Sequence, residues 1–171
     1  MQAPYNGLSF FRGITMKTYR LYQKQFLPID LAEAWAFFSN PRNLRLITPD
    51  RLDFVITSPS GEKMYPGQII TYTLRPLFGI KAGWVTEIKH VHEPYTFVDE
   101  QRSGPYKLWH HRHVLREVPG GIEAEDEVYY ALPYGFLGQL AHALFVQREL
   151  ARIFAYRKSV LDRKFGPLKA A

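Results

Sequence analysis

The sequence predicts an α+β protein in which a curved antiparallel sheet of about seven strands wraps around one long C-terminal helix. Two observations carry this prediction. Short runs rich in β-branched and aromatic residues follow one another through the middle of the chain, with turn residues between them. The final part instead repeats apolar residues at helical spacing over about 30 residues without an internal proline. At 171 residues, 46% of them hydrophobic, the chain is long enough to bury a single core.

The first third predicts one strand and then two short helices. Residues 17–28 are rich in Tyr, Leu and Phe and form the strand. Asp30 with Glu33 resembles a capping box at the start of the first helix. Asn40 and Pro41 suit the cap and first turn of a second helix, which stops before Pro49.

Further strands are expected at residues 52–58, 68–77, 80–92 and 95–103. Because short links join consecutive strands, the sheet should be an antiparallel meander. A helix is expected from Phe136 to about Phe165, closed by a Gly-Pro pair. Its predicted core-facing stripe consists of Leu140, Ala143, Leu144, Gln147, Leu150, Ala151, Phe154 and Leu161.

The segment from Lys107 to Gly135, KLWHHRHVLREVPGGIEAEDEVYYALPYG, predicts a β-hairpin. A two-residue loop at Pro119-Gly120 or at Gly120-Gly121 divides the side chains between the two faces in the same way. One face is a ladder of opposite charges and should meet solvent. The other face should be the interior one, and it carries Trp109, His111, His113 and Leu115 opposite Ile122, Ala124, Asp126, Val128, Tyr130 and Leu132.

His111, His113 and Asp126 are the leading candidate site residues, because an inward carboxylate beside imidazole can fix its tautomer and raise its pKa. The alternative is that they only satisfy one another within a polar part of the core. If the turn near Ser103 pairs residues whose numbers sum to 210, Asp99 lies opposite His111 and Gln101 joins the same face. Three aromatic residues either pack in the core or line a cavity: Trp84, Trp109 and Tyr130.

We expect neither a metal nor another cofactor. The five histidines between positions 90 and 113 do not assemble three or four ligands, since another strand separates His90 and His92 from the strand of His111 and His113, a distance of roughly 10 Å in a sheet. The sequence contains no nucleophile-elbow, phosphate-loop, HExxH or Rossmann motif.

Three phrases carry a resemblance to a known superfamily: AWAFFSNPRNLRLITP, FVDEQRSGPYKLWHHRH and EDEVYYALPYG. Over residues 17–165 the chain resembles the START-like, helix-grip superfamily, also called SRPBCC. That group includes polyketide cyclases, lipid-transfer START domains and birch-pollen-allergen-like proteins. The resemblance implies a helix-grip fold with a hydrophobic tunnel between sheet and C-terminal helix. It implies no universal catalytic motif, so only the position of the cavity carries over.

The function expected from these features is binding of a small hydrophobic ligand, such as a lipid, polyketide or aromatic metabolite. The ligand-binding candidates are Trp84, Asp99, Gln101, Trp109, His111, His113, Asp126 and Tyr130. An alternative is a cyclase, dehydratase or isomerase that uses the His and Asp side chains for acid/base chemistry. A third interpretation is that the basic C-terminal helix contacts an acidic partner or a membrane surface.

The composition limits the possible cross-links, partners and location of the protein. The absence of cysteine excludes disulfides and thiolate sites, and no apolar run approaches a membrane span. The net charge of +6 is dispersed, so no nucleic-acid partner is expected. Residues 1–15 lack the features of a secretory signal and are expected to be a flexible extension of a single domain, 16–171, in the cytoplasm. Nothing in the sequence indicates an oligomeric state.

Overall fold

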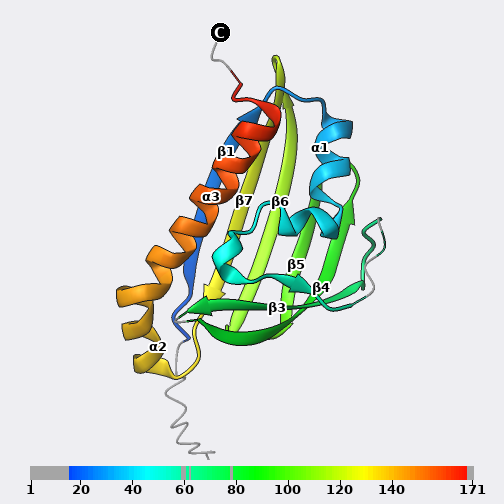
Figure 1. The fold of residues 1–171 in the computed structure, drawn as a ribbon. Helices are drawn as coiled ribbons and strands as arrows, with labels where there is room; N and C mark the ends of the chain where they lie inside the picture. The colour runs from blue at the N-terminus through cyan, green and yellow to red at the C-terminus, as the bar shows by residue number, and fades with distance from the viewer. Residues whose placement is uncertain (1–15, 59–60, 62, 78, 169–171) are drawn as a thin grey trace, which may run out of the picture.

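A computed structural model describes residues 16–58, 61, 63–77 and 79–168, so the extension expected at 1–15 lies outside the described residues. Seven antiparallel strands form one sheet in the order β1-β7-β6-β5-β4-β3-β2 (Figure 1). Strands β2 to β7 therefore form the predicted antiparallel meander, and β1 pairs with β7 at its edge. The strands are β1 (Tyr19–Leu27), β2 (Val55–Ile56), β3 (Ile69–Leu77), β4 (Ile80–His92), β5 (Thr96–Ser103), β6 (Leu108–Val118) and β7 (Gly121–Ala131).

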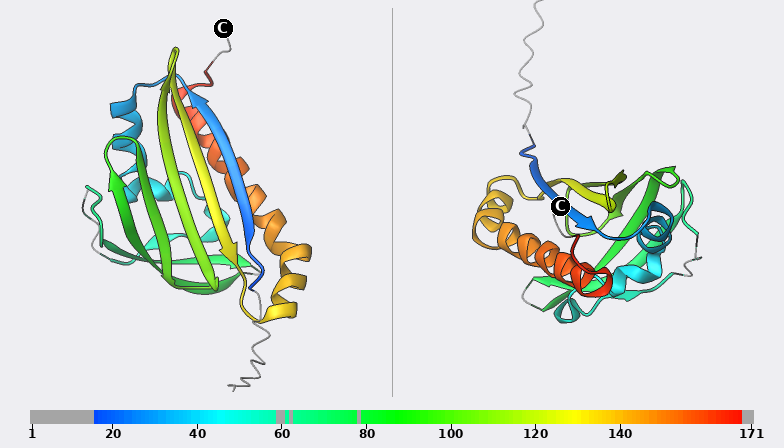
Figure 2. Two further views of the ribbon diagram at one scale, coloured as in Figure 1. Left: turned by 180° about the vertical axis from the view of Figure 1, so that it is seen from behind. Right: turned by 90° about the horizontal axis from the view of Figure 1, so that it is seen from above.

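The sheet is strongly curved, and all the helices lie on its concave side (Figures 1 and 2). Two register shifts in the pairing of β4 with β5 increase the local bend. The helical elements are α1 (Leu31–Phe38), η1 (Pro41–Arg45), η2 (Asp50–Leu52), α2 (Gly135–Ala141), η3 (His142–Val146) and α3 (Gln147–Phe165). The predicted α+β architecture, with a long C-terminal helix held by the sheet, is confirmed.

The hairpin of β6 and β7 adopts the register with Pro119 and Gly120 in the loop, because Leu108 pairs with Ala131 and Val118 with Gly121. Gly120 has φ +84°, a conformation that glycine adopts without steric cost. His113 lies directly opposite Asp126 on β7. On the other side of β6, Asp99 of β5 pairs with His111, as the sum of 210 predicts.

The charge ladder predicted on the outer face is present, and β1 extends it. Glu127 lies between Arg20 of β1 and Arg112 of β6, with N–O distances of 2.8 and 2.6 Å. Arg116 donates hydrogen bonds to both Glu123 and Glu125. Flanking side chains cover the central carboxylates so well that Glu125 is only 6% exposed on what is nominally the solvent face. Interstrand charge pairing thus fixes the positions of three neighbouring strands.

The short helices begin where the caps predict. The Asp30 carboxylate accepts a hydrogen bond from the Glu33 amide, and the Asn40 side chain accepts one from the Arg42 amide. The second predicted helix is a 3₁₀ turn, η1. The strand predicted at 52–58 is wrong in extent, because η2 and a left-handed Asp53 (φ +46°) occupy its start and leave only β2.

The C-terminal helix is continuous, but the first half of its predicted apolar stripe is wrong. Near its start, η3 forms a π-helical turn, which adds about one residue to that turn and so rotates the preceding residues about the helix axis. Gly138, His142 and Val146 therefore face the core, while Leu140 and Leu144 are about half exposed. From Leu150 onward the predicted positions Leu150, Phe154 and Leu161 are buried, whereas the predicted position Ala151 is exposed.

Two neighbouring apolar clusters fill the space between sheet and helices. One lies under α1 and the end of α3, around Trp35, Phe97 and Ile122. The other lies under the first half of α3, around Trp84, Trp109 and Tyr130. Within the described residues, no helix is both long and apolar enough to cross a membrane.

Glu125 provides a pH-dependent test of the outer ladder. The hydrogen bond from Arg116 holds the pKa of the Glu125 carboxyl below its ordinary value, despite the opposing effect of burial. Ionised Glu125 therefore favours the folded state above pH ~4.5, and this contribution is lost as pH falls through the folded-state pKa. We expect Glu125→Gln to lower the free energy of unfolding by about 1–2 kcal/mol at pH 7 in urea titrations, and by less at pH 4.

Glu117→Gln is the matched control, because Glu117 is exposed on the same hairpin. It should change stability by less than about 0.5 kcal/mol at either pH. A cost for Glu125→Gln that stays constant between pH 7 and pH 4 would contradict the assigned role of its charge.

Candidate functional site

A cavity of about 170 Å³ lies between the concave face of the sheet and α3. The loop that follows α1, together with η1 and η2, closes its side. Most of its wall is apolar. Its lining includes Leu44, Leu52, Phe54, Ile70, Tyr72, Leu74, Trp84, Ile88, Tyr106, Trp109, Leu150 and Phe154.

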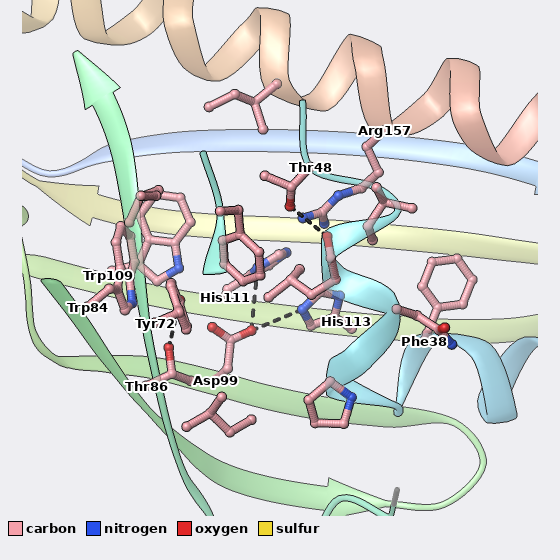
Figure 3. Close-up of a pocket in the computed structure, with 18 of the residues that line it drawn as sticks. Phe38, Thr48, Tyr72, Trp84, Thr86, Asp99, Trp109, His111, His113 and Arg157 are labelled. Atoms are coloured by element: carbon pink, nitrogen blue, oxygen red, sulfur yellow. Dashed lines mark hydrogen bonds and ion pairs between the residues drawn. The ribbon is translucent and has the colours of Figure 1, made fainter. Parts of the chain in front are cut away.

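Aromatic rings form one end of the cavity (Figure 3). Tyr72 stacks on Trp84 with ring centroids 5.7 Å apart, and Trp84 meets Trp109 edge to face at 5.3 Å. The Tyr106 ring packs against both tryptophans. The Tyr72 hydroxyl is paired with the Thr86 hydroxyl at 2.9 Å. This end of the cavity suits a flat apolar group.

The other end is polar, and we call its four residues the His–Asp cluster: Asp99, His111, His113 and Asp126. The two imidazoles lie side by side with ring centroids 3.7 Å apart. Asp126 Oδ1 is 2.9 Å from His111 Nε2 and 3.0 Å from His113 Nδ1. Asp99 Oδ2 is 3.0 Å from His113 Nε2 and 3.5 Å from His111 Nδ1 (Figure 3). Each ring is thus held between two carboxylates.

Arg157 reaches this cluster from α3, with Nη1 3.4 Å from Asp126 Oδ1. Burial raises the pKa of the Asp126 carboxyl, but Arg157 and the two imidazoles outweigh burial and hold that pKa well below its ordinary value. Burial likewise raises the pKa of Asp99, and His111 and His113 reverse that shift. Both carboxyl groups are therefore ionised at neutral pH.

The two imidazoles differ in basicity. Burial lowers the pKa of His111, and the neighbouring His113 lowers it further. Burial also lowers the pKa of His113, but its bonds to Asp126 and Asp99 overcome that effect and leave the pKa raised. These directions favour a cationic His113 beside a neutral His111. Chemically, such a cluster can hold a proton, orient a polar group of a ligand or bind a cation.

Two hydrogen-bond donors on cavity-lining residues have no partner within the part of the chain that the structure describes. The indole Nε1 of Trp84 and the guanidinium Nε of Arg157 are both buried and unbonded. Trp84 is 6% exposed and Arg157 is 8% exposed. A buried donor without an acceptor costs about 1–3 kcal/mol. These two atoms are therefore places where a bound molecule could supply the missing acceptors.

The sequence-predicted candidates divide into two groups. Those that line the cavity are Trp84, Asp99, Trp109, His111 and His113. The other three lie behind the lining. Asp126 bonds both imidazoles from β7, and the Tyr130 hydroxyl is 2.9 Å from His142 Nε2. Gln101 binds the backbone N–H and C=O of Tyr106, and so holds the loop that carries the Tyr106 ring.

Arg157 is the main site residue that the sequence analysis does not identify. Its position in the sequence nevertheless indicates that it is buried. It is three residues after Phe154 and four before Leu161, so it falls on the buried stripe of α3. An arginine at such a position must meet an acidic partner inside. Tyr106 and Thr86 were also missed, and no periodicity distinguishes them from ordinary strand and loop residues.

Solved structures with the same fold confirm the helix-grip architecture. A protein from Thermus thermophilus superposes with a TM-score of 0.66 at 13% identity, over 86% of this chain and 97% of that one. Major latex-like protein 151 from Panax ginseng superposes with a TM-score of 0.63 at 11% identity, over 88% of this chain and 99% of that one. Ara h 8.0201 superposes with a TM-score of 0.56 at 14% identity, over 85% of this chain and 98% of that one. No protein-family model matches the sequence, and no curated protein does.

Arg157 should contribute strongly to stability, because without it Asp126 loses the guanidinium that compensates its buried charge. We expect Arg157→Met to lower the free energy of unfolding by about 3 kcal/mol in urea titrations at pH 7. Arg152→Met, on an exposed position of the same helix, should cost less than about 0.5 kcal/mol. Equal costs for the two substitutions would show that Arg157 does not compensate the cluster.

Proposed function

We propose that this protein binds a small hydrophobic ligand that carries a hydrogen-bond acceptor. The proposal rests mainly on a largely apolar cavity lined by Trp84 and Arg157, whose Nε1 and Nε atoms are buried donors without a partner among the described residues. A native core packs with few voids larger than a water molecule. A space of about 170 Å³, lined by two residues that carry unsatisfied donors, is therefore better explained as a binding site than as a packing defect.

The volume limits the size of the buried part of the ligand. An apolar cavity of about 150 Å³ in a protein interior is known to hold one benzene molecule. A cavity of about 170 Å³ therefore holds one substituted aromatic ring or a branched chain of similar size. The aromatic end, with Tyr72, Trp84 and Trp109, offers ring faces and edges to such a group.

The acceptor is best a neutral oxygen, such as that of a carbonyl. Asp126 already compensates the charge of Arg157, so an additional buried anion would lack a counter-charge of its own. A carbonyl oxygen accepts the free hydrogen bonds without that cost. The helix-grip fold supports the same function, because the resemblance to START-like proteins implies a hydrophobic ligand between sheet and helix.

Filling the cavity should prevent binding. Leu44 lines the cavity, whereas Leu46 is 53% exposed one position beyond η1. We expect Leu44→Trp to weaken binding of acetophenone at least ~10-fold in calorimetric titrations, because the indole would occupy the ligand's volume. Leu46→Trp should leave the affinity unchanged. Equal affinities for the two variants, each with a native circular dichroism spectrum, would place the binding site elsewhere.

The unpartnered donors predict a preference for oxygenated ligands. Acetophenone and ethylbenzene have similar shape, but only acetophenone has a carbonyl acceptor. We expect acetophenone to bind at least ~5-fold more tightly, which corresponds to about 1 kcal/mol for satisfying one buried donor. Trp84→Phe should reduce this ratio. Trp35→Phe, the same change in the core outside the cavity, should preserve it. A ratio near one in the unmodified protein would contradict the assigned role of the donors.

A further inference from the structure

We propose that Asp99, His111 and His113 bind one divalent transition-metal ion at the polar end of the cavity. Asp99 Oδ2, His111 Nδ1 and His113 Nε2 would be its protein ligands. This site goes beyond the proposed ligand binding and does not depend on it, because the metal needs only these three side chains.

The three side chains converge because of strand register. Asp99 of β5 pairs directly with His111 of β6, and His113 follows two residues later on the same face. The three donor atoms, one from each residue, all lie within 4.8 Å of one another. Asp99 Oδ2 is 3.0 Å from His113 Nε2 and 3.5 Å from His111 Nδ1. Metal–nitrogen and metal–oxygen bonds near ~2.1 Å place neighbouring ligand atoms about 3–3.5 Å apart.

The hydrogen-bond pattern leaves a place for a cation at this point. His111 is nearer to Asp126, through Nε2 at 2.9 Å, than to Asp99, through Nδ1 at 3.5 Å. With its proton on Nε2, a neutral His111 directs the lone pair of Nδ1 toward the Asp99 carboxylate. Two acceptors that face each other repel unless a positive charge lies between them. A metal ion bound to both atoms removes this repulsion, and it replaces the proton that His113 Nε2 otherwise shares with the Asp99 carboxylate, so that binding releases this proton.

Asp126 and Arg157 complete the arrangement from behind. Metal-binding histidines commonly donate their second ring N–H to a carboxylate, which orients the ring and increases its basicity. Asp126 Oδ1 serves both rings in this way, through His111 Nε2 and His113 Nδ1. Arg157 compensates the charge of Asp126. Asp126 thus becomes a positioning residue, which agrees with its location behind the cavity lining.

Two imidazoles and one carboxylate favour a transition metal such as zinc or iron(II) over magnesium or calcium, which prefer oxygen ligands. Because all three ligands border the cavity, the remaining coordination positions face it. We expected no metal from the sequence because the histidines alone could not supply three ligands. The pairing of Asp99 with His111 brings a carboxylate to the two imidazoles as the third ligand, so three ligands are available.

The test uses the full chain without an affinity tag, stripped with a chelator and then dialysed. We expect calorimetric titration with Zn²⁺ to show one ion per chain, and Co²⁺ to give visible absorption bands of a low-symmetry site. Mg²⁺ should give no comparable signal. Asp99→Asn and His111→Gln should abolish the Co²⁺ bands, and Asp126→Asn should weaken Zn²⁺ binding about 10- to 100-fold. His110→Gln is the matched control, because His110 points outward to Glu100 and should have no effect.

A second measurement needs no substitution, so it remains decisive if a variant fails to fold. In nitrogen-15 spectra of the histidine side chains, Zn²⁺ should shift Nδ1 of His111 and Nε2 of His113, and leave His110 unchanged. Opposite ring nitrogens are specified for the two residues, so an adventitious surface site cannot produce this pattern. Absence of binding, or Zn²⁺ binding that shifts other nitrogens or survives in folded His111→Gln, would overturn the proposal and leave a cluster that holds only protons.

Discussion

The register of β6 between β5 and β7 determines which side chains reach the cavity. Along the HHRH run, alternate residues point to opposite faces, so a slip by one residue would exchange them. Arg112 would then enter the apolar interior, and His111 and His113 would face solvent. The outer ladder opposes such a slip, since Arg112 and Arg116 meet Glu127 and Glu125 only in the observed register. Charge pairing outside the sheet thereby fixes the geometry inside it.

The sequence predicts the fold and the inward face well, because both depend on short-range periodicity. Alternation with a period of two assigns His111, His113 and Asp126 to one side, and the turn residues limit the register to two equivalent choices. The start of the C-terminal helix is different. The π-helical turn at His142–Val146 changes which residues face the core, and no local sequence pattern predicts this turn. The left-handed conformation of Asp53, which shortens β2, likewise cannot be predicted from the spacing of apolar residues.

The candidate site is only partly predictable, for a related reason. A cavity is a volume left unfilled by many side chains, so its lining depends on loop positions that periodicity does not set. Leu44 reaches it from the short turn η1 and Tyr106 from the loop between β5 and β6. Arg157 could have been found from its place on the buried stripe of α3. The pairing of Asp99 with His111 could be predicted from the sequence, but its interpretation as a third ligand requires the positions of the three ligand atoms in the structure.

A buried group of charges such as the His–Asp cluster contributes little net stability. Arg157 compensates it from α3, but desolvation of these ionisable side chains offsets most of their mutual attraction. The fold itself does not require the cluster, because the apolar contacts of α3 with the sheet continue on both sides of it. What distinguishes it from a structural ion pair is its position, since Asp99 and both imidazoles border an apolar cavity. The physical argument for a binding role thus rests on costly polar groups placed where a bound molecule or ion would meet them.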